Sequence, residues 1–455
     1  MLPSATKAKI LEFFETEVIT KLKDLKNSLK EGDLYNFEKI VERKLLDCHN
    51  FICELLISLV SQELLLSLKS DAKKQGCKEF KKRTCLIRLA TGKEIRVDNY
   101  YIGKAAKDWN QSRHLISNHW KLIHGASPLL YDRIGYCSAL GPSYEIANKT
   151  LEKFGVKLST SSVRDITNRF AIYCNEMGEE NLVIKSEESV KGKRVVLSID
   201  GGRTKIRSYG KDELIKLNQN GNKTYQADWM EPKLFVIDIL DENKGQVARH
   251  ELPIYGVRFS EEDLMDQLEK HLIKLKITEA AQVQIIADGA PWIWNRTKPL
   301  LLKLNVSKEK IIETLDYYHA IKYVNELVES MPKRITKEMR TNYLIQFKNW
   351  LWKGESGKII KECNKVYKQK NKLVKRWLTY LDKHTEKTQY ADFNENNLMC
   401  GSGIVESAIR RVINLRFKNP STFWEKENVE KLYFLRGALL SGRWDFIFKN
   451  IIKTR

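Results

Sequence analysis

The sequence predicts an α/β protein: a mixed sheet with helices, interrupted by an all-helical insertion and preceded by a mainly helical region. Strand-like apolar runs are concentrated in one stretch of the chain, whereas apolar residues recur at helical spacing on both sides of it. We therefore expect five parts: 1–125, helical with a short β-hairpin; 126–190, a helix-turn-helix-like region; 191–320, the first part of an α/β core; 321–398, a basic helical insertion; and 399–455, the final helices of the core.

The N-terminal region is expected to be helical. Apolar residues recur at helical spacing from Ala5 to about Lys74, which indicates two or three helices. The most apolar stretch, Leu45 to Leu68, is interrupted by charged and polar side chains, so it favours an amphipathic helix over a membrane span. Residues 84–103 alternate apolar and polar side chains on both sides of a Thr-Gly pair, which predicts a β-hairpin.

The two helices that follow have the spacing of a helix-turn-helix. Ser143 caps the first, over residues 144–154, and the second covers residues 161–171. Arg164 and Asn168 are among the outward residues of the second helix, a set suited to reading a major groove. Glycine-containing helical hairpins with polar faces are also common in proteins that do not bind DNA, so both interpretations stay open.

From residue 192 the pattern becomes that of a sheet. The predicted elements are strands at Arg194–Ile199, Lys233–Leu240 and Val247–Leu252, a helix at about Ser260–Leu275, and a strand at Val283–Ala287. Three early strands, a helix and another strand are the order expected of an RNase H-like fold. After residue 320 the chain returns to helical spacing, with basic residues in excess of acidic ones.

The formal net charge of +21 favours a polyanionic partner such as nucleic acid, because self-repulsion of this size destabilises a compact chain. A Lys-rich protein from an AT-rich genome has the same composition, so charge alone does not decide. The eight cysteines include no CxxC pair, which argues against a disulfide framework or a zinc ribbon and for reduced thiols in the cytoplasm. The N-terminal residues lack the layout of a signal peptide.

Two predicted strands end in an Asp-Gly pair. Asp200 follows VVLSI and Asp288 follows VQIIA, with a helix between the two strands. Both carboxylates are therefore expected at one edge of a sheet, where like charges repel unless a cation lies between them. Asp-Gly is also one of the commonest pairs in strand-ending turns. Trp292 and Trp294 follow Asp288 and could either stack on a base or fill the core.

A third acid, Glu406, lies early in a helix after a Gly-Ser-Gly turn. Arg410 is one helical turn further along and shares its face, and Arg411 and Lys418 follow. An exposed Glu-Arg pair at a helix start is ordinary for this composition. With the two aspartates, however, three carboxylates could hold two Mg²⁺ ions ~4 Å apart, one activating a water or a 3′-hydroxyl and the other stabilising the leaving oxygen.

Asp316 and His319 are three residues apart at a predicted strand-to-helix junction, so both could face one cleft. His319 could contact a scissile phosphate or support a metal ligand, with Asp316 behind it. The pair is also a common capping and hydrogen-bonding device. The absence of HExxH, Walker A, GxSxG and GxGxxG sequences removes the commonest competing enzyme classes.

Taken in order, five strings resemble the bacterial insertion-sequence transposases of the ISKra group, over residues 84–448. They are SIDGGRTKIR, ADGAPWIWN, LDYYHA, GSGIVESAIRRVINLRFK and FLRGALLSGRWDFIF. The resemblance implies a DDE catalytic triad at Asp200, Asp288 and Glu406, with two Mg²⁺ or Mn²⁺ ions as cofactors.

The resemblance extends to the pair Asp316 and His319, which matches the Asp-x-x-His element found before a helical insertion in Mutator-like and hAT-like transposases. One departure concerns zinc. Relatives often carry a cysteine-rich zinc element where this chain has only Cys77 and Cys85, and the histidines downstream have no recognised ligand spacing. We therefore do not predict a zinc site.

The function implied is a transposase that binds the terminal inverted repeats of its element, cuts a strand there and joins the freed 3′-hydroxyl to target DNA. The expected partners are double-stranded DNA and further copies of the chain, because two ends must be joined in concert. Candidates for DNA contacts are Arg203, Lys205, Arg410, Arg411 and Lys418, with Trp292 and Trp294 near the transferred end. Most of these cations could equally be solvated surface. A structure-specific nuclease on the same fold and a non-catalytic DNA-binding descendant stay open as alternatives.

Overall fold

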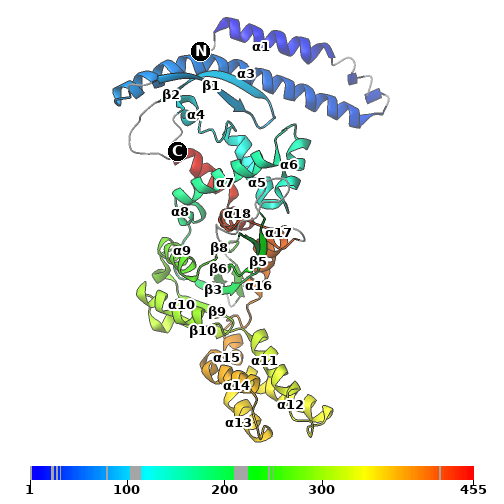
Figure 1. Cartoon of the computed structure of the whole chain (residues 1–455), viewed down its shortest axis with the longest axis vertical. Coiled ribbons are helices and arrows are strands. Elements are labelled where there is room, and N and C mark those ends of the chain that lie inside the picture. The colour runs from blue at the N-terminus through cyan, green and yellow to red at the C-terminus, as the bar shows by residue number, and fades with distance from the viewer. Residues whose placement is uncertain are drawn as a thin grey trace. The chain divides into compact units, whose positions relative to one another are not determined.

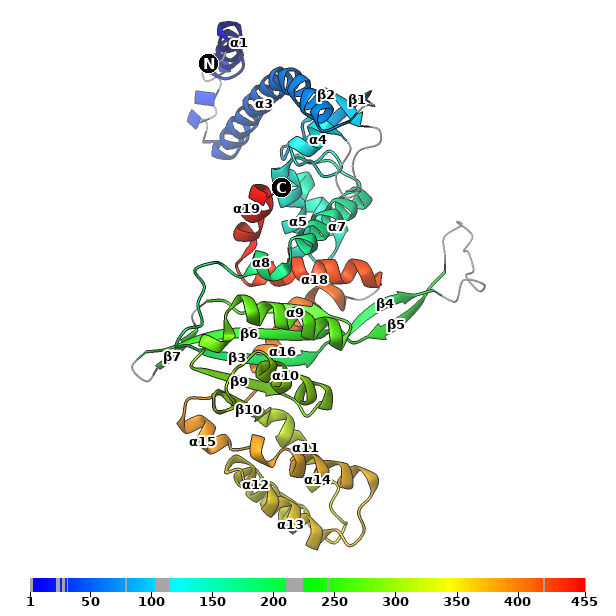
Figure 2. The same ribbon diagram turned by 90° about the vertical axis from the view of Figure 1, so that its left-hand side faces the viewer.

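The computed structural model describes residues 3–21, 25–26, 29–30, 32–77, 80–102, 114–209, 224–243, 246–249, 251–419 and 422–454. The chain divides into two compact units, residues 1–170 with 452–455 and residues 171–451, and each is described by itself. Figure 1 and Figure 2 label the elements of both units.

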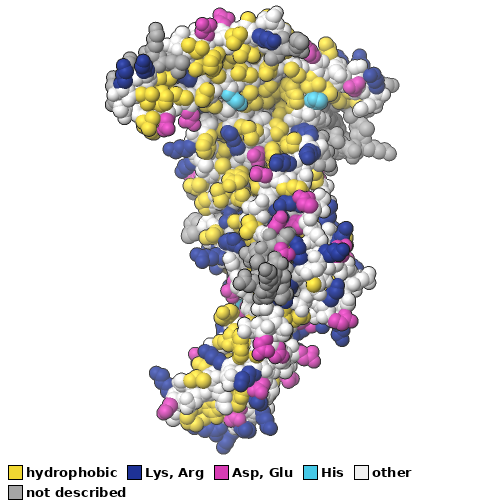
Figure 3. All heavy atoms as spheres, turned by 180° about the vertical axis from the view of Figure 1, so that it is seen from behind, with side chains coloured by type: hydrophobic (Ala, Val, Ile, Leu, Met, Phe, Trp, Pro, Cys, Tyr) yellow, Lys and Arg dark blue, Asp and Glu magenta, His cyan; other side chains and the backbone are white. Residues whose placement is uncertain are grey.

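The first unit begins with the helices α1 (Ser4–Glu17) and α3 (Leu34–Lys74), with a 3₁₀ turn, η1 (Ile19–Lys21), after α1. Both helices lie in the stretch predicted to be helical. Among the described helices, α3 alone is long and apolar enough to cross a membrane by length and composition, and 11% of its apolar window is buried. Figure 3 shows many hydrophobic side chains gathered over this unit.

The predicted hairpin is present as β1 (Phe80–Arg88) and β2 (Glu94–Ile102), paired antiparallel. Gly92 in the hairpin turn adopts φ +84°, a backbone conformation that is unfavourable for residues other than glycine. It also lies directly against the backbone carbonyl of Gly155, so a Cβ at this position has no room. Apolar residues of α3 pack against the hairpin and form one hydrophobic core with it.

Four further helices follow, α4 (Leu115–His119), α5 (Pro128–Leu140), α6 (Tyr144–Lys153) and α7 (Thr160–Glu176), the last continuing into the second unit. The two helices of the predicted helix-turn-helix are therefore present, as α6 and α7. Ser143 caps α6 by accepting a hydrogen bond from the amide of Ile146 at 3.1 Å, and Ser159 accepts from the amide of Ser162 at 3.1 Å. Binding of DNA by this pair stays a prediction.

The cysteines of the first unit are not grouped with other possible metal ligands among the described residues. All eight cysteines of the protein are free. Cys85 is buried, with its Sγ 3.2 Å from the hydroxyl of Ser117, and Cys77 is half-buried. Neither belongs to a described group of three possible metal ligands.

The second unit is built on one mixed sheet. Its strands are β3 (Arg194–Gly201), β6 (Lys233–Asn243), β7 (Gln246–Arg249), β8 (Ile254–Arg258), β9 (Gln282–Ala287) and β10 (Ile311–Leu315). The order is β10-β9-β3-β6, with β7 and β8 both paired to β6. β10, β9 and β3 are parallel, whereas β6 is antiparallel to β3 and to β7 and β8. The apolar runs of β3 and β9 are buried because they form the centre of this sheet.

The predicted strand Val247–Leu252 needs correction. The structure ends β7 at Arg249 and begins β8 at Ile254, and the two pair with different halves of β6. Pro253 lies between them and has no amide hydrogen to donate, so a continuous ladder through this position is disfavoured. The strongly apolar stretch after Pro253, which we did not predict as a strand, is buried as β8.

A separate two-stranded ribbon, β4 (Thr204–Ser208) and β5 (Gln226–Met230), lies between β3 and β6 in the sequence and was also not predicted. Helices α8 (Glu179–Val183), α9 (Glu261–Lys274) and α10 (Pro291–Lys303) accompany the sheet, with the 3₁₀ turns η3 (Ile277–Glu279) and η4 (Lys308–Lys310). The predicted helix Ser260–Leu275 is confirmed as α9, with Ser260 as its N-cap.

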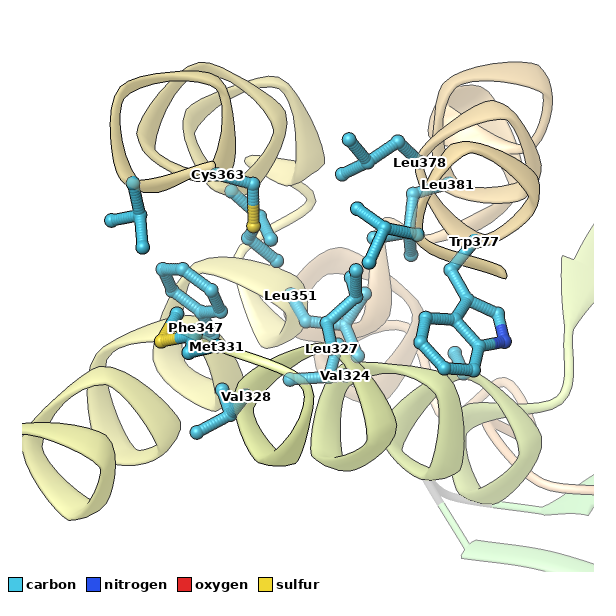
Figure 4. Close-up of a cluster of buried hydrophobic side chains, with 14 of the residues drawn as sticks. Val324, Leu327, Val328, Met331, Phe347, Leu351, Cys363, Trp377, Leu378 and Leu381 are labelled. Carbon is cyan, nitrogen blue, oxygen red and sulfur yellow. The ribbon is translucent and has the colours of Figure 1, made fainter. Parts of the chain in front are cut away.

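The segment predicted as a helical insertion is helical. It comprises α11 (Tyr317–Glu329), α12 (Lys337–Trp352), α13 (Ser356–Val366), α14 (Lys372–Lys383), η5 (Thr385–Lys387) and α15 (Tyr390–Glu395). Figure 4 shows its own core, in which side chains such as Leu327, Phe347 and Leu381 from different helices meet. The cluster also includes Leu315 of β10, so the helices of this segment pack directly against the edge strand of the sheet.

The chain ends with α16 (Gly403–Ala408), a π-helix, η6 (Ile409–Asn414), then α17 (Leu415–Phe417), α18 (Lys426–Leu440) and α19 (Trp444–Thr454). Two arginines in the final part serve the fold. Arg443 is buried and donates to Glu188 at 2.5 Å and to the carbonyl of Leu252 at 2.9 Å. Arg436 donates to the carbonyl of Arg411 at 2.7 Å.

His271 of α9 makes the stability of the second unit depend on pH. It is 1% exposed, and burial lowers its pKa to about 4, while its hydrogen bond to the carbonyl of Gln267 opposes that shift only in part. The folded state therefore keeps the imidazole neutral at pH values where the unfolded chain protonates it. The stabilisation is complete above about pH 6.5 and is lost as the pH falls toward 4, by roughly 3 kcal/mol in total.

We expect urea unfolding between pH 7 and pH 4.5 to show this component as a difference between the wild type and His271→Gln, which lacks it. The difference in unfolding free energy between the two proteins should shrink as the pH falls. Parallel pH profiles would contradict the assignment.

Candidate active site

Three aspartates follow three neighbouring parallel strands at one edge of the sheet. Ile199 in β3 is paired with Ala287 in β9, and Ala287 is paired with Leu315 in β10. The next residue along each strand is an aspartate: Asp200, Asp288 and Asp316. The carboxyl ends of parallel strands meet at the same edge, so the sheet itself brings these three residues together. The predicted proximity of Asp200 and Asp288 follows from this register.

Asp200 is the acid whose ionisation the site disfavours. Burial is the largest cause and raises its pKa to about 6; Asp288 and Glu231 add to the shift, while the amide of Gly201 and His319 oppose it. The Oδ1 of Asp200 accepts that amide at 2.6 Å. A half-buried carboxylate among other acids is stabilised in its charged form by a cation, so the electrostatics of this edge favour binding one.

Two hydrogen bonds hold Asp288 in place, one to its side chain and one to its backbone carbonyl. Its Oδ1 accepts the amide of Ala290 at 2.9 Å, and its carbonyl accepts the indole N–H of Trp294 at 2.7 Å. Gly289 lies so close to the ring of Tyr380, from α14, that a Cβ would overlap it. The helical insertion therefore packs directly against the loop that carries Asp288.

Asp316 and His319 form a coupled pair. Asp316 is 0% exposed, caps α11 by accepting the amide of Tyr318 at 2.8 Å, and accepts the Nδ1 of His319 at 3.0 Å. Burial favours the neutral acid, but hydrogen bonds from His319, Ser402 and the Tyr318 amide outweigh it and lower the pKa of Asp316. The bond to Asp316 in turn raises the pKa of His319, with Asp288 and Asp200 adding to the effect.

Glu406 reaches this edge from a distant part of the sequence. Its amide donates to the carbonyl of Ser402 at 3.1 Å, and the hydroxyl of Ser402 donates to Asp316. This contact fixes the start of α16 beside the end of β10. The exposed Glu406 is followed by the π-helix η6, an uncommon geometry that occurs often at functional sites.

The structure groups Glu406 with residues other than the predicted triad. Ligand atoms of Asp316, His319 and Glu406 all lie within 4.8 Å of one another, and this is the group of three possible metal ligands found among the described residues. The predicted set of Asp200, Asp288 and Glu406 stays a prediction. Carboxylate oxygens are the donors that Mg²⁺ and Mn²⁺ prefer, so the side chains at this edge fit such a cation.

The predicted DNA-contacting cations have different surroundings. Arg203, Arg410 and Lys418 are exposed. Arg411 is partly buried, and its Nη2 donates to the hydroxyl of Tyr255 at 2.8 Å, so it also has a structural partner. The Nζ of Lys205 lies 5.1 Å from the ring centroid of Trp229 and 5.7 Å from that of Phe423.

The two tryptophans also differ. Trp294 donates to the backbone of Asp288 and has the Nζ of Lys387 4.5 Å from its ring centroid, which favours packing over stacking on a base. Trp292 is half-buried, with the Nζ of Lys233 5.4 Å from its ring centroid. In the first unit, Arg164 is exposed and donates to Asp165 at 3.0 Å. Asn168 is half-buried, and its Oδ1 accepts the hydroxyl of Tyr144 at 3.5 Å.

Sequence reasoning missed three residues near this edge: Glu231, Tyr380 and Ser402. Glu231 raises the pKa of Asp200. Its carboxylate forms an ion pair with the Nζ of Lys233 at 2.9 Å. The position of Ser402 in the Gly-Ser-Gly turn just before Glu406 could have identified it as a residue near the site. Nothing in the helical periodicity distinguished Tyr380 from other aromatic residues of the insertion.

No protein-family profile and no curated protein matches the sequence. A solved structure, the Drosophila P element transposase strand transfer complex, is similar at 12% sequence identity, over 71% of this chain and 81% of that chain, with a TM-score of 0.23. A TM-score of this size does not establish a shared fold or a shared function.

We expect Gly289→Ala to destabilise the protein by about 1–3 kcal/mol, because the added methyl overlaps the ring of Tyr380 and overpacks the site. Urea unfolding measures the change. In a Tyr380→Leu background the same substitution should be less damaging, since the ring is gone.

Gly357→Ala in α13 is the matched control, because nothing lies within 4 Å of a Cβ at that position. It should leave stability unchanged or raise it slightly, as alanine favours a helix. Equal effects of the two substitutions in the wild-type background would contradict the close contact between the insertion and the Asp288 loop.

Proposed function

We propose that this chain is a DDE-type transposase, which cuts DNA at the terminal inverted repeats of an insertion sequence and transfers the freed strand to a target. The observation that carries the proposal is the alignment of Asp200, Asp288 and Asp316 at the carboxyl ends of three adjacent parallel strands. Glu406 and His319 belong to the same edge through Asp316. Such a concentration of acids, one of them strongly shifted, is typical of metal-dependent phosphodiester chemistry.

The strand order supports an RNase H-like core. Three antiparallel strands, β8, β6 and β3, are followed by β9 and β10 parallel to β3. Along the chain, β3, β6 and β8 precede the helix α9 and the strand β9, an order that supports this fold. The five sequence strings that resemble ISKra-group transposases point the same way, and they include every acid at this edge except Glu231.

In this proposal Asp200, Asp288 and Glu406 hold two Mg²⁺ or Mn²⁺ ions. The ions would activate a water or a 3′-hydroxyl and stabilise the leaving oxygen. Asp316 is buried and fully engaged in hydrogen bonds, so its role is to orient His319 and the start of α16. The raised pKa of His319 favours its protonated form, whose positive charge suits a scissile phosphate oxygen.

The partner in this proposal is double-stranded DNA. The net charge of +21 suits it, and the exposed Arg203, Arg410 and Lys418 lie in the segments that carry Asp200 and Glu406. The helices α6 and α7 are proposed to read the terminal repeats. Joining two ends in concert requires two catalytic sites, so a dimer or larger assembly is proposed.

Asp200→Asn should reduce metal-dependent cleavage of a repeat-bearing DNA by on the order of a hundredfold or more, because a bound metal ion supplies several kcal/mol of transition-state stabilisation. Asp288→Asn and Glu406→Gln should do the same. Asp266→Asn, an exposed carboxylate on α9, is the control and should retain full activity.

The products of the same assay separate transposition from simple cleavage. Strand-joined products are expected with the wild type in Mg²⁺, whereas a structure-specific nuclease would give cut products only. If Asp200→Asn keeps metal-dependent end cleavage, the assignment of the acids is wrong.

Arg164→Ala in α7 should weaken binding of the terminal repeat by about 1–3 kcal/mol and reduce the preference for the repeat over random DNA, if this residue contacts bases. Lys149→Ala, an exposed cation on α6, is the comparison. A phosphate contact there would weaken both DNAs equally. Unchanged preference in Arg164→Ala, measured by competition with random duplex, would argue against base reading by α7.

A further inference from the structure

The ribbon β4–β5 has two faces of opposite character. On one face Thr204 is 0% exposed and bonds to the hydroxyl of Tyr433 at 2.7 Å, and Ile206 is 4% exposed. Because side chains alternate along a strand, Lys205 and Arg207 belong to the other face. Lys205 is directly opposite Trp229 in the register. The ribbon is therefore anchored by one face and presents the other.

The backbone around Trp424 extends this surface by a third segment. The amide of Arg207 donates to the carbonyl of Trp424 at 2.8 Å, and the amide of Trp424 donates to the carbonyl of Lys205 at 3.1 Å. Its neighbours Phe423 and Glu425 consequently flank the cations of β4. The Nζ of Lys205 lies 5.7 Å from the ring centroid of Phe423.

We call the side chains Lys205, Arg207, Tyr209, Tyr225, Trp229, Phe423 and Glu425 the ribbon face. Its cations alternate with rings: the Nζ of Lys205 is 5.1 Å from the centroid of Trp229, and the guanidinium of Arg207 is 4.7 Å from that of Tyr225. Glu425 is the one acid of the set and lies 3.8 Å from Arg207.

The large aromatic side chains of this face are unusually exposed. Trp229 is 51% exposed and Tyr225 is 40% exposed. A lysine stem covers part of Trp229, yet half of its surface remains open to solvent. Aromatic rings of this size are normally buried. Exposed rings suit a planar ligand and the neighbouring cations suit an anionic one, so this face favours a ligand with both properties.

We propose that the ribbon face binds unpaired nucleotides of a DNA strand, with a base stacked on Trp229 and phosphates near Lys205 and Arg203. Stacking on aromatic side chains combined with cations along the backbone is the usual way to bind single-stranded nucleic acid. The bases of an intact duplex stack on one another and have no free face to offer to Trp229.

The position of the ribbon in the chain determines which nucleotides these are. Only Gly201, Gly202 and Arg203 separate Asp200 from the first residue of β4. A strand bound on the ribbon face is therefore within a few residues of the proposed cleavage site. This inference rests on the proposed function, and it assigns to the ribbon the nucleotides that are unpaired beside the cut.

The test uses the full-length chain carrying Asp200→Asn, without metal, so that binding is measured apart from cleavage. The probes are a fluorescein-labelled blunt duplex, the same duplex with a five-nucleotide oligo(dT) overhang, and the overhang sequence as oligo(rU). Fluorescence anisotropy gives each affinity. In this background Trp229→Ala should weaken overhang binding at least about fivefold, the loss of one base stack, and leave blunt-duplex binding within about twofold. Trp229→Phe should keep most of the affinity.

Tyr35→Ala is the matched control. Tyr35 is 73% exposed on α3, with the Nζ of Lys39 5.7 Å from its ring centroid, but it has no neighbouring strand of cations. It should change neither affinity. Lys205→Ala should weaken both DNAs, because a phosphate contact does not depend on pairing.

Equal weakening of both DNAs by Trp229→Ala would overturn the stacking proposal, and so would no change in either. Tighter binding of the oligo(rU) overhang would assign the face to RNA instead. A thermal unfolding transition like that of the parent protein establishes that each variant is folded. These outcomes do not depend on whether Asp200 is catalytic, so failure of the cleavage prediction and failure of this one are distinguishable.

Discussion

The mutual repulsion of carboxylates at one sheet edge is the constraint on which the rest of this structure depends. The parallel register of β3, β9 and β10 brings three aspartates to the same line, and the fold has no freedom to separate them. It stabilises them differently instead. Hydrogen bonds from His319 and Ser402 stabilise the charged form of Asp316, whereas burial raises the pKa of Asp200 to about 6. That remaining electrostatic strain is what makes the edge suited to a divalent cation.

Two distant segments support this edge. The insertion contributes Tyr380, which packs on Gly289, and a contact between Lys387 and Trp294, whose indole bonds to the backbone of Asp288. The final helices contribute Ser402, which connects Asp316 to the start of the helix that carries Glu406. The helices of the insertion share one hydrophobic core with Leu315 of β10, which holds the insertion against the sheet.

The basic residues divide into structural and available ones, and their number in the sequence does not separate the two. Arg443 and Arg436 are buried partners of backbone carbonyls, and Arg411 bonds to Tyr255. Arg203 and Lys418 are exposed. The ribbon adds a surface in which Lys205 is paired with an exposed Trp229, so part of the positive charge is combined with rings that a simple count of lysines does not reveal.

The sequence by itself determined the elements whose signal is local. Apolar runs ending in Asp-Gly identified β3 and β9 and placed Asp200 and Asp288 at one edge. Both signals are local, because a buried strand and the turn that ends it depend on residues next to one another in the sequence. The capping serine Ser143 identified α6 for the same reason. Strand β8 had no turn signal of comparable strength, and β4 and β5 are only partly buried, so these strands depend on their pairing partners.

Only the tertiary structure decided which residues complete the site. The grouping of Glu406 with Asp316 and His319 depends on a hydrogen bond between residues 86 positions apart, and the contact of Tyr380 with Gly289 joins α14 to the loop after β9. Contacts of this kind leave no periodic pattern in the sequence, because they arise from how separately specified elements pack against one another.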